Sequence, residues 1–269
     1  MNLKITIITV TLNNSSNLDK TIASVLNQNY SNIEYIIIDG GSIDDTFEII
    51  KKYEKYSFKF VSEKDNGIYD AMNKGILLAT GDVINFLNAG DMFYDNNVLC
   101  SVADQYDKYL MIGILYGRSE FFSDIERILY IKGQEVQLSA LWKKMPACHQ
   151  SMFFRKELFT KFGLYDLKFR IASDFELFLR FVNLMPKDGY LLVYTNEILS
   201  KIELYGINSK NYIHTWLETK QASQIYYACT LKSNFYYNIM FIKSYFLIFL
   251  SRLNILKYYR RLKYNYLKK

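Results

Sequence analysis

The first third of the chain alternates between segments typical of buried strands and segments typical of helices. Strand-like runs rich in Ile, Val and Thr occupy residues 3–10, 33–38, 58–62 and 83–87. Helical spacing of apolar residues occupies the intervals between them, at residues 18–28, 44–50 and 68–78. This order predicts an α/β fold with a Rossmann-like, mostly parallel sheet that carries helices on both faces.

A polar side chain follows each predicted strand, where the strand ends. These side chains are Asn13, Asp39, Asp65 and Asp91. The carboxyl ends of parallel strands meet at one edge of a sheet, and open α/β sheets bind ligands in the crevice at that edge. The sequence contains neither G-x-G-x-x-G nor G-x-x-x-x-G-K-[ST], so a dinucleotide fingerprint and a P-loop are both excluded.

The pattern is less regular beyond Asp91. Strands are predicted at residues 111–116 and 151–154, and helices at residues 174–181, 215–227 and, as one long apolar and basic stretch, 235–262. We therefore expect an α/β domain over residues 1–215 and a helical, basic extension over residues 216–269.

The excess of positive over negative charge lies in this extension. The formal net charge is +6, yet no Asp or Glu follows Glu218, whereas ten Lys and Arg do. Residues up to Glu218 therefore carry 23 basic against 27 acidic side chains, a balance that argues against nucleic-acid binding. The extension suits the cytoplasmic face of an anionic membrane. The alternative is a helical hairpin that packs on the domain or forms a homo-oligomer.

A membrane span is not favoured. Asn238 and Lys243 interrupt the apolar run at residues 235–250, and a clean span needs about 20 apolar residues. The N-terminus lacks the basic region and cleavage site of a signal peptide, so we interpret it as the first strand.

Three aspartates are candidates for chemistry, and position alone leaves a structural alternative open for each. Asp39 can accept a hydrogen bond from a base or a ribose hydroxyl, or cap a turn. Asp91 can be a ligand of a hard divalent cation that bridges two phosphates, or a turn aspartate. Asp174 can act as a general base for an acceptor hydroxyl, or cap a helix.

The remaining polar candidates are weaker when taken singly. Asp70 and Lys74 share a helix face, which also suits an ordinary solvated surface. The two histidines, His149 and His214, lack the spacing of a zinc site, and a packing role is their default. The three cysteines form no C-x-x-C pair and fit buried thiols in a reducing cytoplasm.

The order of the motifs is more specific than any one of them. The ordered segments are residues 9–13, 24–28, 38–46, 63–75, 79–82 and 86–91, followed by 148–150 and 172–177. Together they resemble family 2 glycosyltransferases with the GT-A fold. The last two segments resemble acceptor-side motifs of the bacterial surface-polysaccharide branch, and the resemblance covers residues 3–209.

The resemblance implies inverting hexosyl transfer from a nucleoside-diphosphate sugar, usually UDP-linked, with Mg²⁺ or Mn²⁺. The acceptor would be a hydroxyl of a lipid-linked saccharide in capsule or lipopolysaccharide O-antigen assembly. By position, the nucleotide sugar would be bound by Thr11, Asn13, Asp39, Asp70, Lys74 and Asn88. Asp91 would bind the metal, Asp174 would be the catalytic base, and the acceptor side would include His149, Gln150 and Glu176.

One departure from the family pattern bears on the metal. The usual acidic cluster is reduced here to Asn88-x-Gly90-Asp91, so we expect weaker metal affinity than in relatives with two or three carboxylates.

Two other functions compete with this interpretation. A nucleotidyltransferase can use a similar domain and metal, but residues 13–17 are neither basic nor Gly-rich, as a triphosphate loop would be. A non-catalytic nucleotide-sugar-binding module is the second, and the joint presence of Asp39, Asp91 and Asp174 argues against it. Release of UDP when an acceptor is added separates the three functions.

Overall fold

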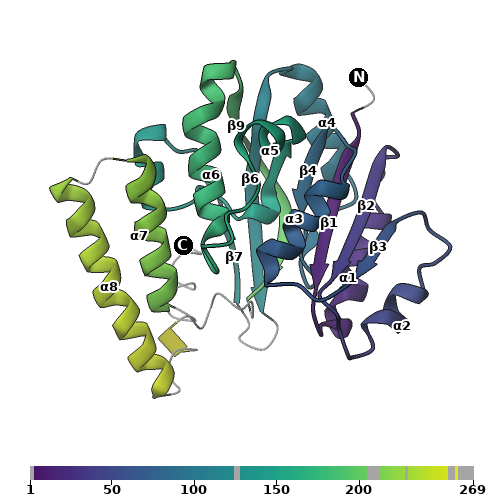
Figure 1. Ribbon diagram of the computed structural model, residues 1–269, viewed down its shortest axis with the longest axis horizontal. Coiled ribbons are helices and arrows are strands. Elements are labelled where there is room, and N and C mark those ends of the chain that lie inside the picture. The colour runs from purple at the N-terminus through teal and green to yellow at the C-terminus, as the bar shows by residue number, and fades with distance from the viewer. Residues whose placement is uncertain (1–2, 124–127, 205–211, 228–229, 254–257, 260–269) are drawn as a thin grey trace.

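One mixed sheet with helices on both faces forms the body of the molecule (Figure 1). The computed structural model describes residues 3–123, 128–204, 212–227, 230–253 and 258–259. Its strands run in the order β3-β2-β1-β4-β8-β6-β9-β5, with β7 added to β6. Their bounds are β1 Ile5–Thr11, β2 Ile33–Asp39, β3 Lys59–Ser62, β4 Val83–Phe86, β5 Met92–Phe93, β6 Ile112–Ser123, β7 Ile128–Lys132, β8 Met152–Arg155 and β9 Leu191–Glu203.

The N-terminal half of the sheet is parallel, as the alternating pattern predicts. β1 pairs in parallel with β2 and β4, and β2 pairs in parallel with β3. Thr11 lies opposite Asp39 at the carboxyl ends of β1 and β2. The α/β expectation is therefore confirmed in this half, and the strand ends that carry the polar candidates meet at one edge.

The second half of the sheet is mixed, which the expectation of a mostly parallel sheet did not anticipate. β8 is antiparallel to both β4 and β6, while β6 and β9 are parallel. Short β5 and β7 then pair antiparallel to β9 and β6. The apolar alternation of a strand is the same in both directions, so the sequence pattern does not fix the direction in which a strand pairs.

Two apolar cores lie on opposite faces of the sheet. One contains side chains of α3, α5 and α6, and the other contains side chains of α1, α2 and α4. The helices are α1 Ser15–Leu26, α2 Thr46–Lys51, α3 Ile68–Leu78, α4 Val98–Lys108, α5 Lys156–Phe162, α6 Ser173–Leu184, α7 Tyr212–Tyr226 and α8 Leu231–Arg252, with short 3₁₀ turns η1 Leu138–Lys143, η2 His149–Ser151 and η3 Met185–Asp188. α3 has the bounds that the apolar spacing predicts.

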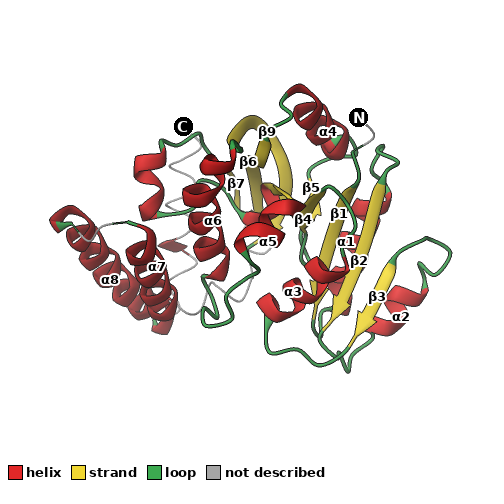
Figure 2. Cartoon of the chain, turned by 45° about the horizontal axis from the view of Figure 1, so that its top comes forward, coloured by secondary structure: helices red, strands yellow, loops and turns green. Residues whose placement is uncertain are grey.

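The C-terminal helices lie beside α6, at the end of the molecule away from β3 (Figure 2). The domain boundary expected between residues 215 and 216 falls inside α7. α7 is also bonded to the body, because the Glu218 carboxylate accepts hydrogen bonds from the backbone N–H groups of Arg170, Ile171 and Ala172. In the part of the chain that the structure describes, no helix combines the length and the apolarity of a membrane span.

Candidate active site

Asp39 is held in a fixed orientation at the carboxyl end of β2. Its side chain is buried, and both carboxylate oxygens accept hydrogen bonds from Ser42, whose hydroxyl lies 2.5 Å from Oδ1. The Ser62 hydroxyl, at the end of β3, donates to Oδ2 at 2.6 Å. Ser42 and Ser62 therefore fix the orientation of the carboxylate, so that it can accept a hydrogen bond from a ligand without a change of side-chain conformation.

Thr11 and Asn13 border Asp39. The Thr11 hydroxyl is buried and has no hydrogen-bond partner among the described residues, so its hydroxyl can bond a ligand. Asn13 adopts a positive φ of 49°, and its Oδ1 accepts from the Ile43 N–H at 2.9 Å. Its backbone N–H donates to the Ser42 hydroxyl at 2.7 Å. Asn13 therefore shapes the loop around Asp39.

Asp70 and Lys74 hold the neighbouring loop between β3 and α3. The Asn66 N–H donates to Asp70 Oδ2 at 2.9 Å. Lys74 Nζ lies 2.8 Å from Glu63 Oε1 and 3.9 Å from Asp70 Oδ2. This loop approaches the Asp39 loop so closely that a Cβ on Gly40 would lie 2.4 Å from Asp65 Oδ2. Both residues therefore lie near the Asp39 end of the edge, and their binding roles remain predictions.

Asp91 forms the second polar centre, beyond the end of β4. Its carboxylate is 8% exposed and accepts a 2.7 Å hydrogen bond from Gln150 Nε2. Burial raises the pKa of Asp91 to about 6, against the opposing effects of the Gln150 hydrogen bond and of His149. Gly90, at φ 105°, makes the turn before Asp91, and the Thr21 hydroxyl donates to the Asp91 carbonyl at 2.8 Å. The turn therefore directs one buried carboxylate to the sheet edge.

The turn η2 joins this centre to the N-terminus of α6. His149 Nε2 lies 3.2 Å from Asn88 Nδ2, and His149 Nδ1 lies 3.6 Å from Asp174 Oδ2. With the Asn88 amide in this orientation its Nδ2 donates to Nε2, and Nδ1 faces the Asp174 carboxylate. The packing role that sequence physics favours for His149 is thus replaced by polar partners on both ring nitrogens.

Asp174 presents one oxygen to the histidine and uses the other for support. Its Oδ1 accepts from the Phe175 N–H at 2.9 Å and from the Tyr69 hydroxyl at 3.2 Å. The N-cap of α6 is Ala172, so Asp174 does not occupy that position. Oδ2 makes the looser contact to His149. A carboxylate with one oxygen anchored and one available suits a general base.

Glu176 has a different environment from Asp174. Two residues along a helix correspond to a rotation of about 200°, so the two side chains leave opposite sides of α6. The Glu176 carboxylate is buried, forms an ion pair with Arg180 at 2.7 Å, and accepts a 2.5 Å hydrogen bond from the Tyr226 hydroxyl of α7. The structure does not bring it into the group around Asp174, and its acceptor-side role remains a prediction.

Two tyrosines that the sequence did not single out belong to the site. The Tyr69 hydroxyl of α3 lies 2.7 Å from the Ile171 carbonyl oxygen and 3.2 Å from Asp174 Oδ1, so its one proton is shared between these two acceptors. The Tyr69 ring stacks on Tyr165 at a centroid distance of 5.2 Å. Burial, and then the charge of Asp174, raises the pKa of both phenols, so both remain protonated. Tyr69 lies 105 residues from Asp174 in the chain, and no local pattern relates the two.

The donor set fits a cation that a diphosphate helps to bind. The described residues contain no group of three or more His, Cys, Asp or Glu side chains placed to hold a metal. Asp91 offers one carboxylate, and the buried Asn88 Oδ1 has no hydrogen-bond partner among the described residues. Mg²⁺ commonly takes one or two protein oxygens and completes its shell with phosphates and water. Asn88 and Asp91 are therefore the residues that would hold it.

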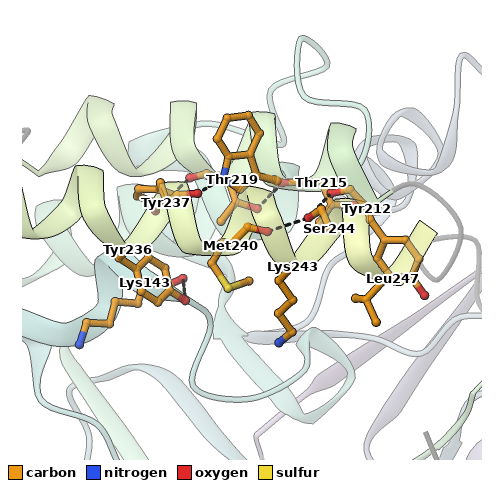
Figure 3. A pocket seen from close by; sticks show the side chains of 11 residues that line it. Lys143, Tyr212, Thr215, Thr219, Tyr236, Tyr237, Met240, Lys243, Ser244 and Leu247 are labelled. Atoms are coloured by element: carbon orange, nitrogen blue, oxygen red, sulfur yellow. Dashed lines mark hydrogen bonds between the residues drawn. The ribbon is translucent and has the colours of Figure 1, made fainter. Parts of the chain in front are cut away.

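A separate cavity of about 170 Å³ lies between α7, α8 and Lys143 (Figure 3). Its walls are mainly aromatic and aliphatic, and they include Trp216, Tyr236 and Met240. It contains none of the predicted site residues. We place the candidate site at the sheet edge, because the convergent carboxylates, histidine and unpartnered polar atoms are found there.

Comparison with known proteins identifies the family of the chain. The family model for glycosyl transferase family 2 matches residues 6–163. A PGL/p-HBAD biosynthesis glycosyltransferase of Mycobacterium tuberculosis is 31% identical over 186 residues, which cover 65% of this chain and 68% of the relative. A second M. tuberculosis glycosyltransferase is 34% identical over 182 residues, with 65% and 68% coverage.

Solved structures share the fold at low sequence identity. The mannosyltransferase PcManGT from Pyrobaculum calidifontis, in complex with GDP-Man and Mn²⁺, aligns with a TM-score of 0.63 at 14% identity, covering 97% of this chain and 74% of that one. S. aureus TarS 1–349 in complex with UDP-GlcNAc aligns with a TM-score of 0.61 at 13% identity. The alignment covers 91% of this chain and 73% of the TarS chain. The chain spans 39% of a longer TarS chain. These neighbours have the fold, and the family match covers more than half of the sequence: the chain belongs to glycosyl transferase family 2.

Proposed function

We propose that the protein is an inverting glycosyltransferase that moves a hexosyl group from a nucleoside-diphosphate sugar to a hydroxyl of a lipid-linked saccharide. The observation that carries the proposal is the η2 turn. Through His149 it contacts the candidate base, Asp174, and through Gln150 it contacts the candidate metal ligand, Asp91. An acceptor-activating group and a leaving-group site are thus held together by adjacent residues.

The donor would bind along the edge from Asp39 to Asp91. Asp39 and the unpartnered Thr11 hydroxyl suit a ribose or base, and the Asn88–Asp91 turn suits the diphosphate. Proteins with a related fold have been solved in complex with UDP-GlcNAc and with GDP-Man, which supports a nucleotide-sugar donor. Between these, we propose a UDP-linked donor because the motif order resembles the polysaccharide branch, whose donors are usually UDP-linked.

Asp174 would carry out proton transfer in a single displacement. Its Oδ2 takes the proton of the acceptor hydroxyl as the hydroxyl oxygen bonds to the anomeric carbon and the bond to the diphosphate oxygen breaks. The nucleoside diphosphate leaves from the opposite face, so the anomeric configuration inverts. Asn88 and Asp91 would hold Mg²⁺ or Mn²⁺, which would supply positive charge to offset the negative charge of the diphosphate. Tyr69 and His149 keep the base in place throughout.

The acceptor and the location of the enzyme are proposed together. A saccharide on a lipid carrier, as in capsule or O-antigen assembly, would bring the reaction to the cytoplasmic face of the membrane. A mycobacterial relative is named for PGL/p-HBAD biosynthesis, and this name supports a role in making cell-surface glycoconjugates.

The test starts with donor binding. Thermal shift with UDP-glucose, UDP-galactose, UDP-GlcNAc and GDP-mannose, each with and without Mn²⁺, should give one donor that stabilises by roughly 2.7 kcal/mol at about 100 times its dissociation constant. Nucleotide release is then measured with that donor and a lipid-linked saccharide fraction.

The products distinguish the alternatives. Release of UDP that depends on the acceptor supports the glycosyltransferase. Release of pyrophosphate from UTP and a sugar phosphate would instead identify a nucleotidyltransferase, and tight donor binding without turnover would identify a binding module.

A further inference from the structure

α8 has one face that packs against the protein. Trp216 of α7 donates from Nε1 to the Tyr237 carbonyl at 2.6 Å, and the Tyr237 hydroxyl donates to the Trp142 carbonyl at 2.7 Å. The rings of Trp216 and Phe241 lie 4.6 Å apart. These contacts fix the rotation of α8 about its axis and therefore determine which side chains face outward.

The outward side chains form a continuous apolar strip. Phe235, Ile242 and Phe249 are spaced seven residues apart, so they lie along one line of the helix, and they are 69%, 68% and 57% exposed. The strip, which we call the outer α8 face, consists of Leu231, Phe235, Ile239, Ile242, Tyr245, Phe246, Phe249 and, just beyond the helix end, Leu253. Among the described residues, Phe246 contacts the Tyr259 ring at a centroid distance of 5.9 Å, and most of the strip is exposed. An exposed apolar face of this length is typical of an interaction surface.

Charge indicates the partner. The segment after Glu218 holds ten Lys and Arg and no carboxylate side chain. One of them, Lys243 of α8, is exposed and lines the cavity between α7 and α8. A second copy of the chain would place another ten positive charges opposite these and would offer no acidic group in the segment to pair with them. An anionic lipid surface offers the opposite charge together with an apolar layer.

The residue types agree with the same partner. Four of the eight side chains on the outer α8 face are aromatic, whereas aliphatic Leu, Ile and Val dominate helix–helix seams. Aromatic rings suit the boundary between headgroups and acyl chains. The opposite face of α8 is occupied by α7, so lipid would reach only one side of the helix.

We propose that the outer α8 face lies on an anionic lipid surface, with its aromatic and aliphatic side chains at the headgroup–acyl boundary. The excess of basic residues in the sequence after Glu218 favours an anionic surface over a neutral one. The proposal rests on the proposed function, because a lipid-linked acceptor is what makes this placement useful. α7 connects α8 to the segment before Asp174, because Glu218 of α7 accepts hydrogen bonds from the backbone N–H groups of residues 170–172.

Vesicle sedimentation of the full chain tests this directly. Wild type is mixed with vesicles of phosphatidylcholine alone and of phosphatidylcholine with phosphatidylglycerol. We expect binding to the anionic vesicles only, weakened between about 0.15 M and about 1 M salt, where screening is stronger. The triple variant Phe235→Ser/Ile242→Ser/Phe249→Ser should bind at least about tenfold less, because three exposed apolar side chains are lost.

A matched variant controls for lost apolar surface in general. Leu77→Ser/Leu110→Ser/Leu167→Ser removes three exposed leucines outside α8 and should bind the vesicles like wild type. The proposal is overturned if wild type ignores anionic vesicles, or if both triple variants bind equally. A dimer in light scattering that only the α8 variant dissociates would assign the face to a second copy. UDP affinity, measured on all three proteins, reports the proposed function separately, since it does not depend on lipid.

Discussion

His149 Nδ1 lies 3.6 Å from Asp174 Oδ2, so the η2 turn lies against the N-terminal turn of α6. The same imidazole contacts Asn88 through Nε2, at 3.2 Å. Its neighbour Gln150 contacts Asp91. The η2 turn therefore contacts both candidate centres, and the substitutions below are chosen to separate their proposed roles.

Asp174→Asn should remove catalysis while preserving donor binding. The amide keeps the shape and cannot accept a proton, so turnover should fall by roughly two to four orders of magnitude. Acceptor-dependent UDP release measures turnover, and calorimetric titration with UDP measures binding. Near-normal turnover would rule out Asp174 as the base.

Glu176→Gln is the matched contrast, two residues away. It leaves the buried Arg180 guanidinium without its charged partner, so the free energy of unfolding should fall by roughly 3 kcal/mol. Turnover of the remaining folded enzyme should change much less than in Asp174→Asn. Urea denaturation and active-site titration give the two values. A loss of turnover without a loss of stability would make Glu176 the base instead.

Asp39 and Asp91 should affect nucleotide binding differently. Asp39→Ala should weaken UDP binding with and without Mn²⁺, because the carboxylate serves the nucleoside. Asp91→Ala should remove only the part of the affinity that Mn²⁺ adds. Ser62→Ala, which deletes one support of Asp39, should have a smaller effect than Asp39→Ala. Calorimetry with UDP checks all three, and wild-type titrations from both aspartate variants would place the site elsewhere.

His149→Ala should lower kcat by about 100-fold, the scale expected when a reacting group is displaced by about 1 Å. The melting temperature should change little, because the ring makes polar contacts at the site edge. The affinity for the donor should stay near the wild-type value. A weaker affinity would indicate damage to the Asp91 turn instead of a displaced base. If the variant unfolds instead, His149 is a packing residue.

The stability of the fold should depend on pH through Glu34, at the opposite end of the sheet from the site. Burial acts to raise the pKa of Glu34, but hydrogen bonds from Lys59, Thr80 and Thr6 outweigh it and lower the pKa from 4.5 to about 2. The ionised form is therefore favoured by folding. Its stabilisation is fully present above about pH 4.5 and is lost as the pH falls toward 2.

Glu34→Gln tests this assignment. Wild type should exceed the variant by roughly 2 kcal/mol near neutral pH, and the difference should shrink as the pH falls through that window. Urea midpoints at several pH values measure it. A difference that is independent of pH would show that the carboxylate charge does not contribute.

Glu218→Gln tests whether α7 positions the base. Three consecutive backbone N–H groups, at residues 170–172, donate to this carboxylate just before Asp174. Loss of its charge should lower kcat by about tenfold, and UDP affinity should stay unchanged. Tyr226→Phe, which removes a different contact of α7, is the control for helix docking alone. Equal losses of kcat in both variants would indicate only a structural role.

The sequence by itself determined the parallel half of the fold and the positions of the polar strand ends. Runs rich in Ile, Val and Thr predicted β1 to β4, and helical spacing of apolar residues predicted the bounds of α3. The ends of the predicted strands gave the positions of Asp39 and Asp91. Periodicity is a local property, and burial on a sheet or helix face enforces it within a few residues. The order of the motifs added the family, which the comparisons confirm.

Only the tertiary structure decided which side chains meet. His149 and Asp174 are 25 residues apart, Tyr69 and Asp174 are 105, and Glu218 reaches back 46 to 48 residues to the segment before the base. It also decided that Glu176 is bound by Arg180 and Tyr226, although it stands two positions from Asp174 in the same motif. Contacts of this kind depend on how strands and helices pack across the sheet. The local sequence around a residue does not determine that packing.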